Sequence, residues 1–285
     1  MSEREDEKGR TRIMQQDPGT SNSDRDQTIS DFGEQWTRHT ENPDYYGSVE
    51  LFADIIAPFL KLEDIKDRKC ADIGSGTGRI VLMMLAAGAA SVLAVEPSRA
   101  YDVLVRNTAQ AGERVRCLNV TGEAIPRDDF DVVLSIGVLH HIPEPGPVVR
   151  AAYEALRPGG QMLVWLYGRE GSRAYQSIFV PVRTITRNLP VVVNEVLSWM
   201  LYPMVLLYAA LTRLIPALPL SNYLSNVYMR FPPAERRLVI LDQINPRWAK
   251  YYSRDEAEAL LHGAGFRNVR LHHRHGYSWT VCGSK

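Results

Sequence analysis

The sequence lacks a charge excess, a cysteine framework and an apolar leader, and each absence removes a class of protein. The 285 residues carry 33 Lys and Arg against 33 Asp and Glu, whereas a general nucleic-acid-binding domain usually has a basic excess. The three cysteines lie far apart without a C-x-x-C pair, so neither a zinc site nor a disulfide scaffold is expected. The N-terminal stretch MSEREDEKGR lacks the apolar core of a signal peptide. We therefore expect a cytoplasmic protein that binds no nucleic acid and no metal.

The N-terminal segment contains very few apolar side chains. Among residues 1–29 only Met1, Ile13, Met14 and Ile29 are apolar, against seven acidic and five basic residues. Such a segment buries too little surface to offset the entropy lost on ordering. We predict a disordered tail over 1–29, followed by an N-terminal lid that begins the ordered core.

From residue 69 onward, short apolar runs alternate with helical patterns. The expected strands cover residues 70–73, 91–96, 114–120, 130–136 and 160–167. Continuous apolar strands alternating with helices are typical of a buried parallel sheet. A capped helix beginning at Ser253 and two closing strands follow near the C-terminus. The predicted fold class is α/β, a doubly wound, mostly parallel, Rossmann-like sheet formed by residues 30–167 and 251–285.

Residues 168–250 interrupt this alternation and are expected to form a largely helical, apolar insertion before the last helix and hairpin. Residues 196–212 contain no charged side chain. Their apolar positions surround the expected helix, so something must cover it. Three alternatives stay open: a lid over a ligand pocket, an interfacial segment that contacts a membrane through 189–220, or a transmembrane span.

The clearest motif is the glycine-rich stretch ADIGSGTGR at 71–79, which follows the first strand. Glycine allows a sharp turn and the close approach of a ligand to the backbone. Glu96 ends the next strand, where an acid is suited to the two hydroxyls of a ribose. The glycine spacing differs from the dinucleotide pattern, and Asp72 would repel a pyrophosphate. The loop therefore suits a nucleoside ligand that carries an amino group and no phosphates.

Together with three later motifs, this loop resembles the class I S-adenosylmethionine-dependent methyltransferases, of the small-molecule type that includes quinone C-methylases. ADIGSGTG is similar to the family's first motif and AVEPS (94–98) to its second. FDVVLSIGVLHHI (130–142) is similar to the fourth, and LRPGGQMLV (156–164) to the strand region after it. The resemblance covers roughly residues 48–167 and 251–285. It implies a methyltransferase fold, S-adenosylmethionine as the cofactor and methyl transfer to a small molecule.

The resemblance also implies which residues contact the cofactor. Asp72 would lie near the methionine amino group, and Glu96 would accept hydrogen bonds from the ribose hydroxyls. In the adenine-binding stretch, Thr121 replaces the family's usual acid, so recognition would fall to the Gly122 amide. The expected cofactor-binding residues are Asp72, Gly74, Gly76, Gly78, Glu96, Thr121, Gly122, Ser135 and Ile136.

The acceptor side is less constrained by the motifs. His140 and His141 are candidates for a general base, with a structural role beneath the cofactor as the alternative. The expected acceptor-binding residues are Trp36, Tyr46, Tyr167, Arg169 and Tyr251. The apolar insertion predicts a small, hydrophobic or lipid-linked acceptor and a cytoplasmic enzyme with membrane contact. Methylation of a sugar or polysaccharide intermediate, and a binding protein that has lost catalysis, remain the alternatives.

Overall fold

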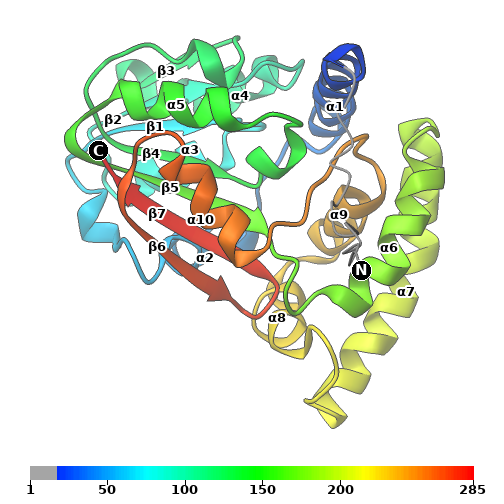
Figure 1. The fold of residues 1–285 in the computed structure, drawn as a ribbon. Coiled ribbons are helices and arrows are strands. Elements are labelled where there is room, and N and C mark those ends of the chain that lie inside the picture. The colour runs from blue at the N-terminus through cyan, green and yellow to red at the C-terminus, as the bar shows by residue number, and fades with distance from the viewer. Residues whose placement is uncertain (1–17) are drawn as a thin grey trace, which may run out of the picture.

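The computed structural model describes residues 18–285, and its centre is one seven-stranded sheet with the strand order β3-β2-β1-β4-β5-β7-β6 (Figure 1). The strands are β1 (Lys69–Ile73), β2 (Ser91–Val95), β3 (Val115–Leu118), β4 (Phe130–Ile136), β5 (Leu156–Tyr167), β6 (Arg267–Arg274) and β7 (Ser278–Ser284). The first five strands are parallel, whereas β7 runs antiparallel to β5 and β6 antiparallel to β7. The predicted doubly wound, mostly parallel α/β fold is confirmed.

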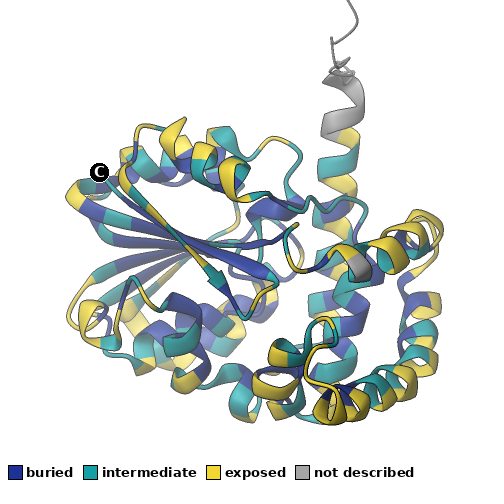
Figure 2. Cartoon of the chain, turned by 60° about the horizontal axis from the view of Figure 1, so that its bottom comes forward, coloured by how far each residue is buried: buried dark blue, intermediate teal, exposed yellow. Residues whose placement is uncertain are grey.

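Helices cover both faces of the sheet because alternate strand residues point to opposite sides. Cys70 packs into a cluster with α2 and α3, while the adjacent Ala71 packs into a second cluster with α5 and α10. Figure 2 shows the strands as mostly buried between these layers. The core helices are α2 (Val49–Ile56), α3 (Arg79–Ala86), α4 (Tyr101–Thr108), α5 (Gly146–Ala155) and α10 (Arg254–His262). Short 3-10 helices are η1 (Asp44–Gly47), η2 (Leu62–Asp64), η3 (Ala109–Arg114), η4 (Gly122–Ala124), η5 (Leu139–His141) and η6 (Tyr228–Arg230).

The predicted capped helix near the C-terminus is confirmed. Ser253 Oγ accepts a hydrogen bond from the Glu256 amide at 3.2 Å, and Glu256 Oε2 accepts one from the Ser253 amide at 2.8 Å. These two bonds satisfy amide groups that the first turn of α10 would otherwise leave without partners.

The N-terminal segment departs from the predicted disordered tail. Helix α1 (Pro18–Arg38) occupies residues 18–29 of the range expected to lack structure, and residues 1–17 lie outside the described part. Its order comes from contacts with distant parts of the chain. Arg25 pairs with Glu123 at 2.9 Å, and Asp24 accepts a hydrogen bond from Arg247 at 3.1 Å. For residues 18–29 the structure differs from the prediction, because local composition does not reveal such long-range polar partners.

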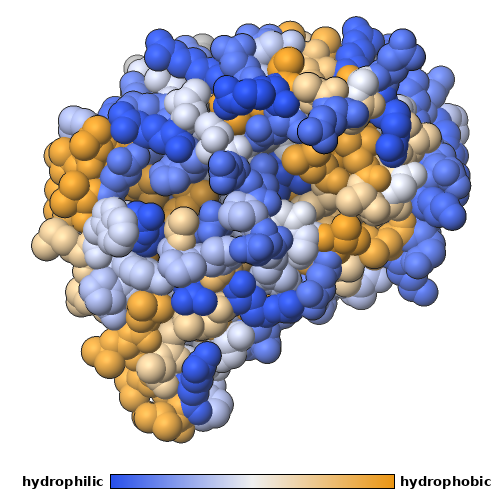
Figure 3. All heavy atoms as spheres, turned by 180° about the vertical axis from the view of Figure 1, so that it is seen from behind, coloured by the Kyte–Doolittle hydropathy of each residue, from blue (hydrophilic) through white to orange (hydrophobic). Residues whose placement is uncertain are grey.

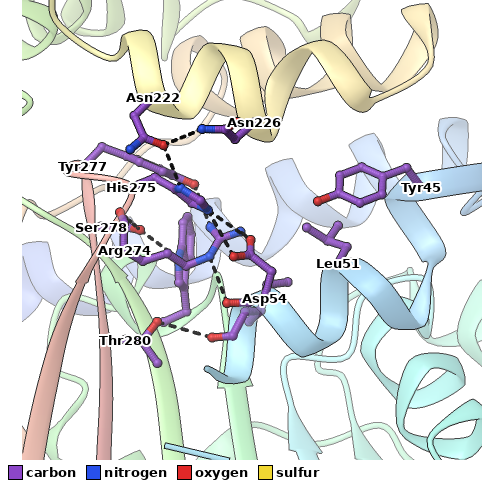
Figure 4. A network of polar contacts seen from close by, with 12 residues as sticks. Tyr45, Leu51, Asp54, Asn222, Asn226, Arg274, His275, Tyr277, Ser278 and Thr280 are labelled. Atoms are coloured by element: carbon purple, nitrogen blue, oxygen red, sulfur yellow. Dashed lines mark hydrogen bonds and ion pairs between the residues drawn. The ribbon is translucent and has the colours of Figure 1, made fainter. Parts of the chain in front are cut away.

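The insertion between β5 and α10 forms α6 (Arg173–Thr186), α7 (Val191–Leu214), α8 (Ser221–Asn226) and α9 (Pro233–Ile244). It leaves and rejoins the core at neighbouring points, because the Tyr252 amide donates to Tyr167 O and the Arg169 amide to Tyr252 O, both at 2.8 Å. Its buried Tyr228 and Leu241 belong to the same apolar cluster as the core helices α2 and α3. Helix α8 also meets the β6–β7 hairpin in the polar network of Figure 4.

Candidate functional site

A cavity of about 630 Å³ lies at the carboxyl ends of the central strands. Ile73 at the end of β1, Ile136 at the end of β4 and Tyr167 at the end of β5 all line it. The strand order reverses between β1 and β4, which is where open α/β sheets bind their ligands. Helix α1 and the insertion form the remaining walls.

The glycine-rich loop after β1 forms one wall of this cavity. Gly74 has φ of +79°, and a Cβ atom there would lie 2.5 Å from Val138. Gly76 has φ of +52° and faces the cavity beside Trp36. Gly78 does not line the cavity, since a Cβ there would press on Leu104 at 3.0 Å. Gly78 therefore allows α3 and α4 to pack closely, and the other two glycines keep the ligand side open.

Glu96, at the end of β2, forms hydrogen bonds that hold this loop in place. Its Oε2 accepts a hydrogen bond from the Gly76 amide at 2.8 Å, and its Oε1 accepts one from the Ser98 amide at 2.9 Å. Glu96 lines the cavity although its side chain is largely buried. Each carboxylate oxygen can accept a second hydrogen bond, so the group can still receive two hydroxyls from a ligand.

Asp72 is a buried carboxyl that does not line the cavity, and one of its two oxygens lacks a hydrogen-bond partner. The residue is 1% exposed, and Oδ2 has no hydrogen-bond partner. Burial raises the Asp72 pKa to about 7, against smaller lowering effects from Ser75 and Arg79. A buried acceptor without a donor is costly unless a ligand supplies one. Because Asp72 is absent from the cavity wall, its expected contact with an amino group of the ligand stays a prediction.

The other expected cofactor residues divide into two groups. Thr121, Gly122 and Ile136 line the cavity. A Cβ at Gly122 would lie 2.7 Å from Val148, so only glycine fits there. Ser135, by contrast, is fully buried and donates to Ile73 O at 3.2 Å, outside the cavity wall. The alternation of β4 turns Ser135 away from the cavity, so we assign it a role in joining β4 to β1.

The two candidate histidines occupy different positions. His141 lines the cavity, and its Nδ1 lies 2.9 Å from Trp248 O. His140 is fully buried behind it, with its ring stacked on Tyr167 at 3.8 Å. Burial lowers the His141 pKa to about 3 and the His140 pKa well below its ordinary value. These environments favour neutral rings, which makes either histidine a weak general base.

Aromatic residues form much of the acceptor side of the cavity. The expected residues Trp36, Tyr46, Tyr167 and Tyr251 all line it. Arg169 does not, because its guanidinium turns outward to Glu256 at 2.8 Å. The strand-end position of Arg169 suggested the cavity, but the acid in the first turn of α10 competes for its side chain.

Several lining residues were missed by sequence reasoning. Helix α1 contributes Thr28 and Phe32, and the insertion contributes Asp242, Gln243 and further apolar residues. Asp242 belongs to a helix whose apolar pattern carried no site motif. Its sequence offered no clear signal, because α9 also carries Glu235, Arg236 and Arg237. Among the described residues, no group of three or more His, Cys, Asp and Glu could hold a metal ion.

A comparison with protein families finds a match for the central part of the core. Residues 71–164 match the family model described as a methyltransferase domain. This part of the chain is therefore similar to methyltransferase domains, in agreement with the resemblance of its motifs. The matched residues include the glycine-rich loop, Glu96 and β4. All three contribute to the wall of the cavity at the carboxyl ends of the strands.

Two curated proteins that are similar to this part of the chain have names that give different activities. A "Ubiquinone biosynthesis O-methyltransferase" of Pseudomonas putida is 31% identical over 43% of this chain and 54% of its own length. A "tRNA U34 carboxymethyltransferase" of Desulfotalea psychrophila is 30% identical over 40% of this chain and 37% of its own. The chain thus spans about half the length, or less, of these curated relatives.

A solved structure agrees with the fold over most of the chain. The 1,6-didemethyltoxoflavin-N1-methyltransferase of Burkholderia thailandensis has a TM-score of 0.54 and 15% identity, covering 93% of this chain and 90% of its own. At 15% sequence identity, this similarity is evidence for the fold and not for the acceptor. The Rossmann-like architecture of the methyltransferase domain is therefore confirmed, and the acceptor has to be argued from this chain's own cavity.

Proposed function

We propose that the protein transfers a methyl group from S-adenosylmethionine to a small, hydrophobic or lipid-linked acceptor. The observation that carries the cofactor assignment is Glu96, a cavity-lining carboxylate at the end of β2 that can still accept hydrogen bonds from two hydroxyls. A nucleoside ligand whose ribose hydroxyls meet Glu96 beside the open Gly76 backbone fits this wall. When bound, the cofactor supplies a methyl group already activated on a sulfonium sulfur.

The chain's own residues then need to position an acceptor and exclude water. The aromatic wall and the insertion supply an apolar enclosure in which an acceptor can be held in line with the methyl group. Correct positioning alone can provide a large part of a rate enhancement. The buried Tyr46 and Tyr167 are fixed by packing, and Gln243 donates to Tyr167 Oη at 2.9 Å.

The walls contributed by the insertion support an apolar acceptor. Ile178 on α6 and Met204 on α7 line the cavity, yet they are 62% and 65% exposed. The cavity wall is therefore continuous with the outer surface of these helices. An apolar molecule on the surface of these helices would therefore meet apolar side chains that also line the cavity.

The outer surface of α7 supports contact with a membrane. Exposed apolar residues on this helix are Val192, Val193, Val196, Trp199, Met200, Met204, Leu207, Leu211 and Leu214. Figure 3 shows hydrophobic side chains along the edge formed by α7 and over the lobe below it. Length and composition alone would let α7 cross a membrane, and 17% of its apolar window is buried. The exposed Arg187 and Arg213 flank this surface and suit anionic headgroups, so we propose peripheral attachment on the cytoplasmic side.

The cofactor assignment is tested by calorimetry with S-adenosylhomocysteine and with NAD. We expect binding of the first and none of the second. Transfer of a labelled methyl group to the organic-soluble fraction of a cell extract would support the acceptor class. Labelling confined to water-soluble sugars or polysaccharides would instead favour the alternative acceptor, and no labelling with intact cofactor binding would indicate a binding protein.

Membrane attachment is tested by flotation with vesicles of phosphatidylcholine, with and without phosphatidylglycerol. We expect the full chain to float with the anionic vesicles and the double variant Met200→Glu, Leu207→Glu to remain in solution. Val105→Glu is the matched control, because Val105 is an exposed apolar residue on α4. Absence of flotation in the unaltered chain would contradict membrane contact but leave the cofactor assignment standing.

A further inference from the structure

Asp242 on α9 is a cavity-lining carboxylate that the cofactor assignment does not use. The two other carboxylates of the lining are already engaged. Glu96 holds two backbone amides, and Glu123 pairs with Arg25 at 2.9 Å. Within the described residues Asp242 forms no ion pair, and its hydrogen-bond donor is the side chain of Gln35.

A chain of buried amide side chains fixes the Asp242 side chain. Gln35 Nε2 donates to Asp242 Oδ1, while Gln35 Oε1 accepts from Asn245 Nδ2 at 3.2 Å. Asn194 Nδ2 in turn donates to Asn245 Oδ1 at 3.1 Å. Both Gln35 and Asn194 are fully buried. This network holds Oδ1 in place, which leaves Oδ2 as the oxygen available to a molecule in the cavity.

The surroundings of Asp242 place it between the loop and the acceptor wall. Its charge contributes to raising the pKa of both Tyr46 and Tyr167, and the Arg79 charge lowers the pKa of Asp242. Arg79 begins α3 directly after the glycine-rich loop, and its guanidinium lies 4.4 Å from the centre of the Tyr46 ring. Burial is the largest effect and raises the Asp242 pKa to about 7. A carboxylate of this kind exchanges a proton near neutral pH.

We propose that Asp242 receives a hydrogen bond from an O–H or N–H group of the acceptor and takes up its proton during methyl transfer. This inference rests on the proposed function. A lone pair of the acceptor oxygen or nitrogen forms the new bond to carbon, and the electron pair of the broken carbon–sulfur bond remains on sulfur. The acceptor proton moves to the Asp242 carboxylate, which later releases it to water. The acceptor class is therefore an apolar molecule with a hydroxyl or amine, such as an alkylated phenol.

The test compares two probes that differ in one donor. 4-Octylphenol can donate a hydrogen bond, whereas its methyl ether 4-octylanisole cannot. Binding is measured by calorimetry in the presence of S-adenosylhomocysteine. We expect the unaltered chain to prefer the phenol by about tenfold, as one hydrogen bond to a charged acceptor implies. In Asp242→Asn, Oδ1 can still accept from Gln35, but an NH₂ group replaces Oδ2, so the preference should vanish.

Glu235→Gln is the matched control, because Glu235 is a buried acid of the same helix that does not line the cavity. It should keep the preference. Asp242→Ala provides a second variant if Asp242→Asn fails to fold. Equal binding of the two probes by the unaltered chain, no binding of either, or an unchanged preference in the Asp242 variants would overturn the proposal. A loss of S-adenosylhomocysteine binding confined to the Asp242 variants would overturn it too, since Asp242 would then hold the cofactor. Failure of the unaltered chain to bind S-adenosylhomocysteine would instead overturn the proposed function.

Discussion

Arg274 at the end of β6 forms an ion pair with Asp54 on α2 (Figure 4). The Arg274 side chain is 4% exposed, whereas that of Asp54 is 34% exposed. His275 extends the contact, with its Nε2 3.1 Å from Asp54 Oδ1 and its Nδ1 3.0 Å from Asn222 Oδ1 on α8. One carboxylate therefore links the closing hairpin, a core helix and the insertion. Burial alone would raise the Asp54 pKa, but the bonds from His275 and Arg274 outweigh it and lower the pKa.

Asp54→Asn should destabilise the fold, because it leaves the buried Arg274 guanidinium without a counter-charge. We expect a loss of about 2 kcal/mol in the free energy of unfolding, since one partner of the pair is partly exposed. Urea unfolding measures it. Glu50→Gln is the control: it breaks the exposed pair with Arg230 on the same face of α2 and should cost less than about 0.5 kcal/mol. Equal costs for both variants would contradict the assigned role of Asp54.

Asp72 should make the free energy of unfolding decrease as the pH rises. An acid in an ion pair, whose pKa is lowered on folding, has the opposite effect. Its pKa rises from 3.8 to about 7 on folding, so between these values the unfolded state has lost a proton that the folded state retains. The penalty is absent below pH 3.8, grows as the pH rises towards 7 and is constant above it. Asp72→Asn cannot ionise, so it should gain about 4 kcal/mol relative to the unaltered chain between acidic and neutral pH. Urea unfolding at several pH values tests this, with the exposed Asp102→Asn as a control that should show no such trend.

Gly76→Val should abolish S-adenosylhomocysteine binding while retaining the secondary structure. A Cβ at this position would lie 3.6 Å from Trp36 Nε1, so the branches of valine must extend into the cavity. Gly112→Val is the matched control, because Gly112 also has a positive φ but a Cβ there meets nothing within 4 Å. The control carries the same kind of backbone strain and should bind normally. Calorimetry and circular dichroism separate the two effects, and retained binding by Gly76→Val would place the cofactor elsewhere.

Glu96→Gln should weaken S-adenosylhomocysteine binding by about 2 kcal/mol, or roughly 30-fold. The new amide donates where the carboxylate accepts, so it cannot satisfy the Gly76 and Ser98 amides and two ligand hydroxyls together. Glu123→Gln is the control within the same cavity, because the Glu123 carboxylate already forms an ion pair with Arg25. Similar losses for both variants in calorimetry would argue against a specific role for Glu96.

The sheet and its ligand edge could be predicted because their signals are local. Each central strand is a short apolar run, and the predicted 130–136 strand coincides with β4. The glycine-rich loop and Glu96 follow strands, so the parallel topology brings them to one edge. Strand alternation was not applied to Ser135, and this is why it was expected in the cavity.

The features that could not be predicted from the sequence depend on contacts between residues that are distant along the chain. The order of α1 rests on Arg25 and Asp24, whose partners lie about a hundred and two hundred residues away. Arg169 was expected to face the ligand, but Glu256 in another helix draws it outward. Asp242 gains its place only when α9 folds back over the sheet, so no motif marks it.

The adjacency of Tyr167 and Tyr252, where the insertion departs and returns, has a consequence for how such proteins diversify. Because the two ends are joined by backbone hydrogen bonds, a segment of different length or composition could be exchanged there without changing the strand order. The glycine-rich loop and Glu96 belong to the part of the chain that such an exchange leaves intact. In such an exchange Trp36, Tyr46 and Tyr167 would stay in place, and only the part of the cavity wall that the insertion supplies would change.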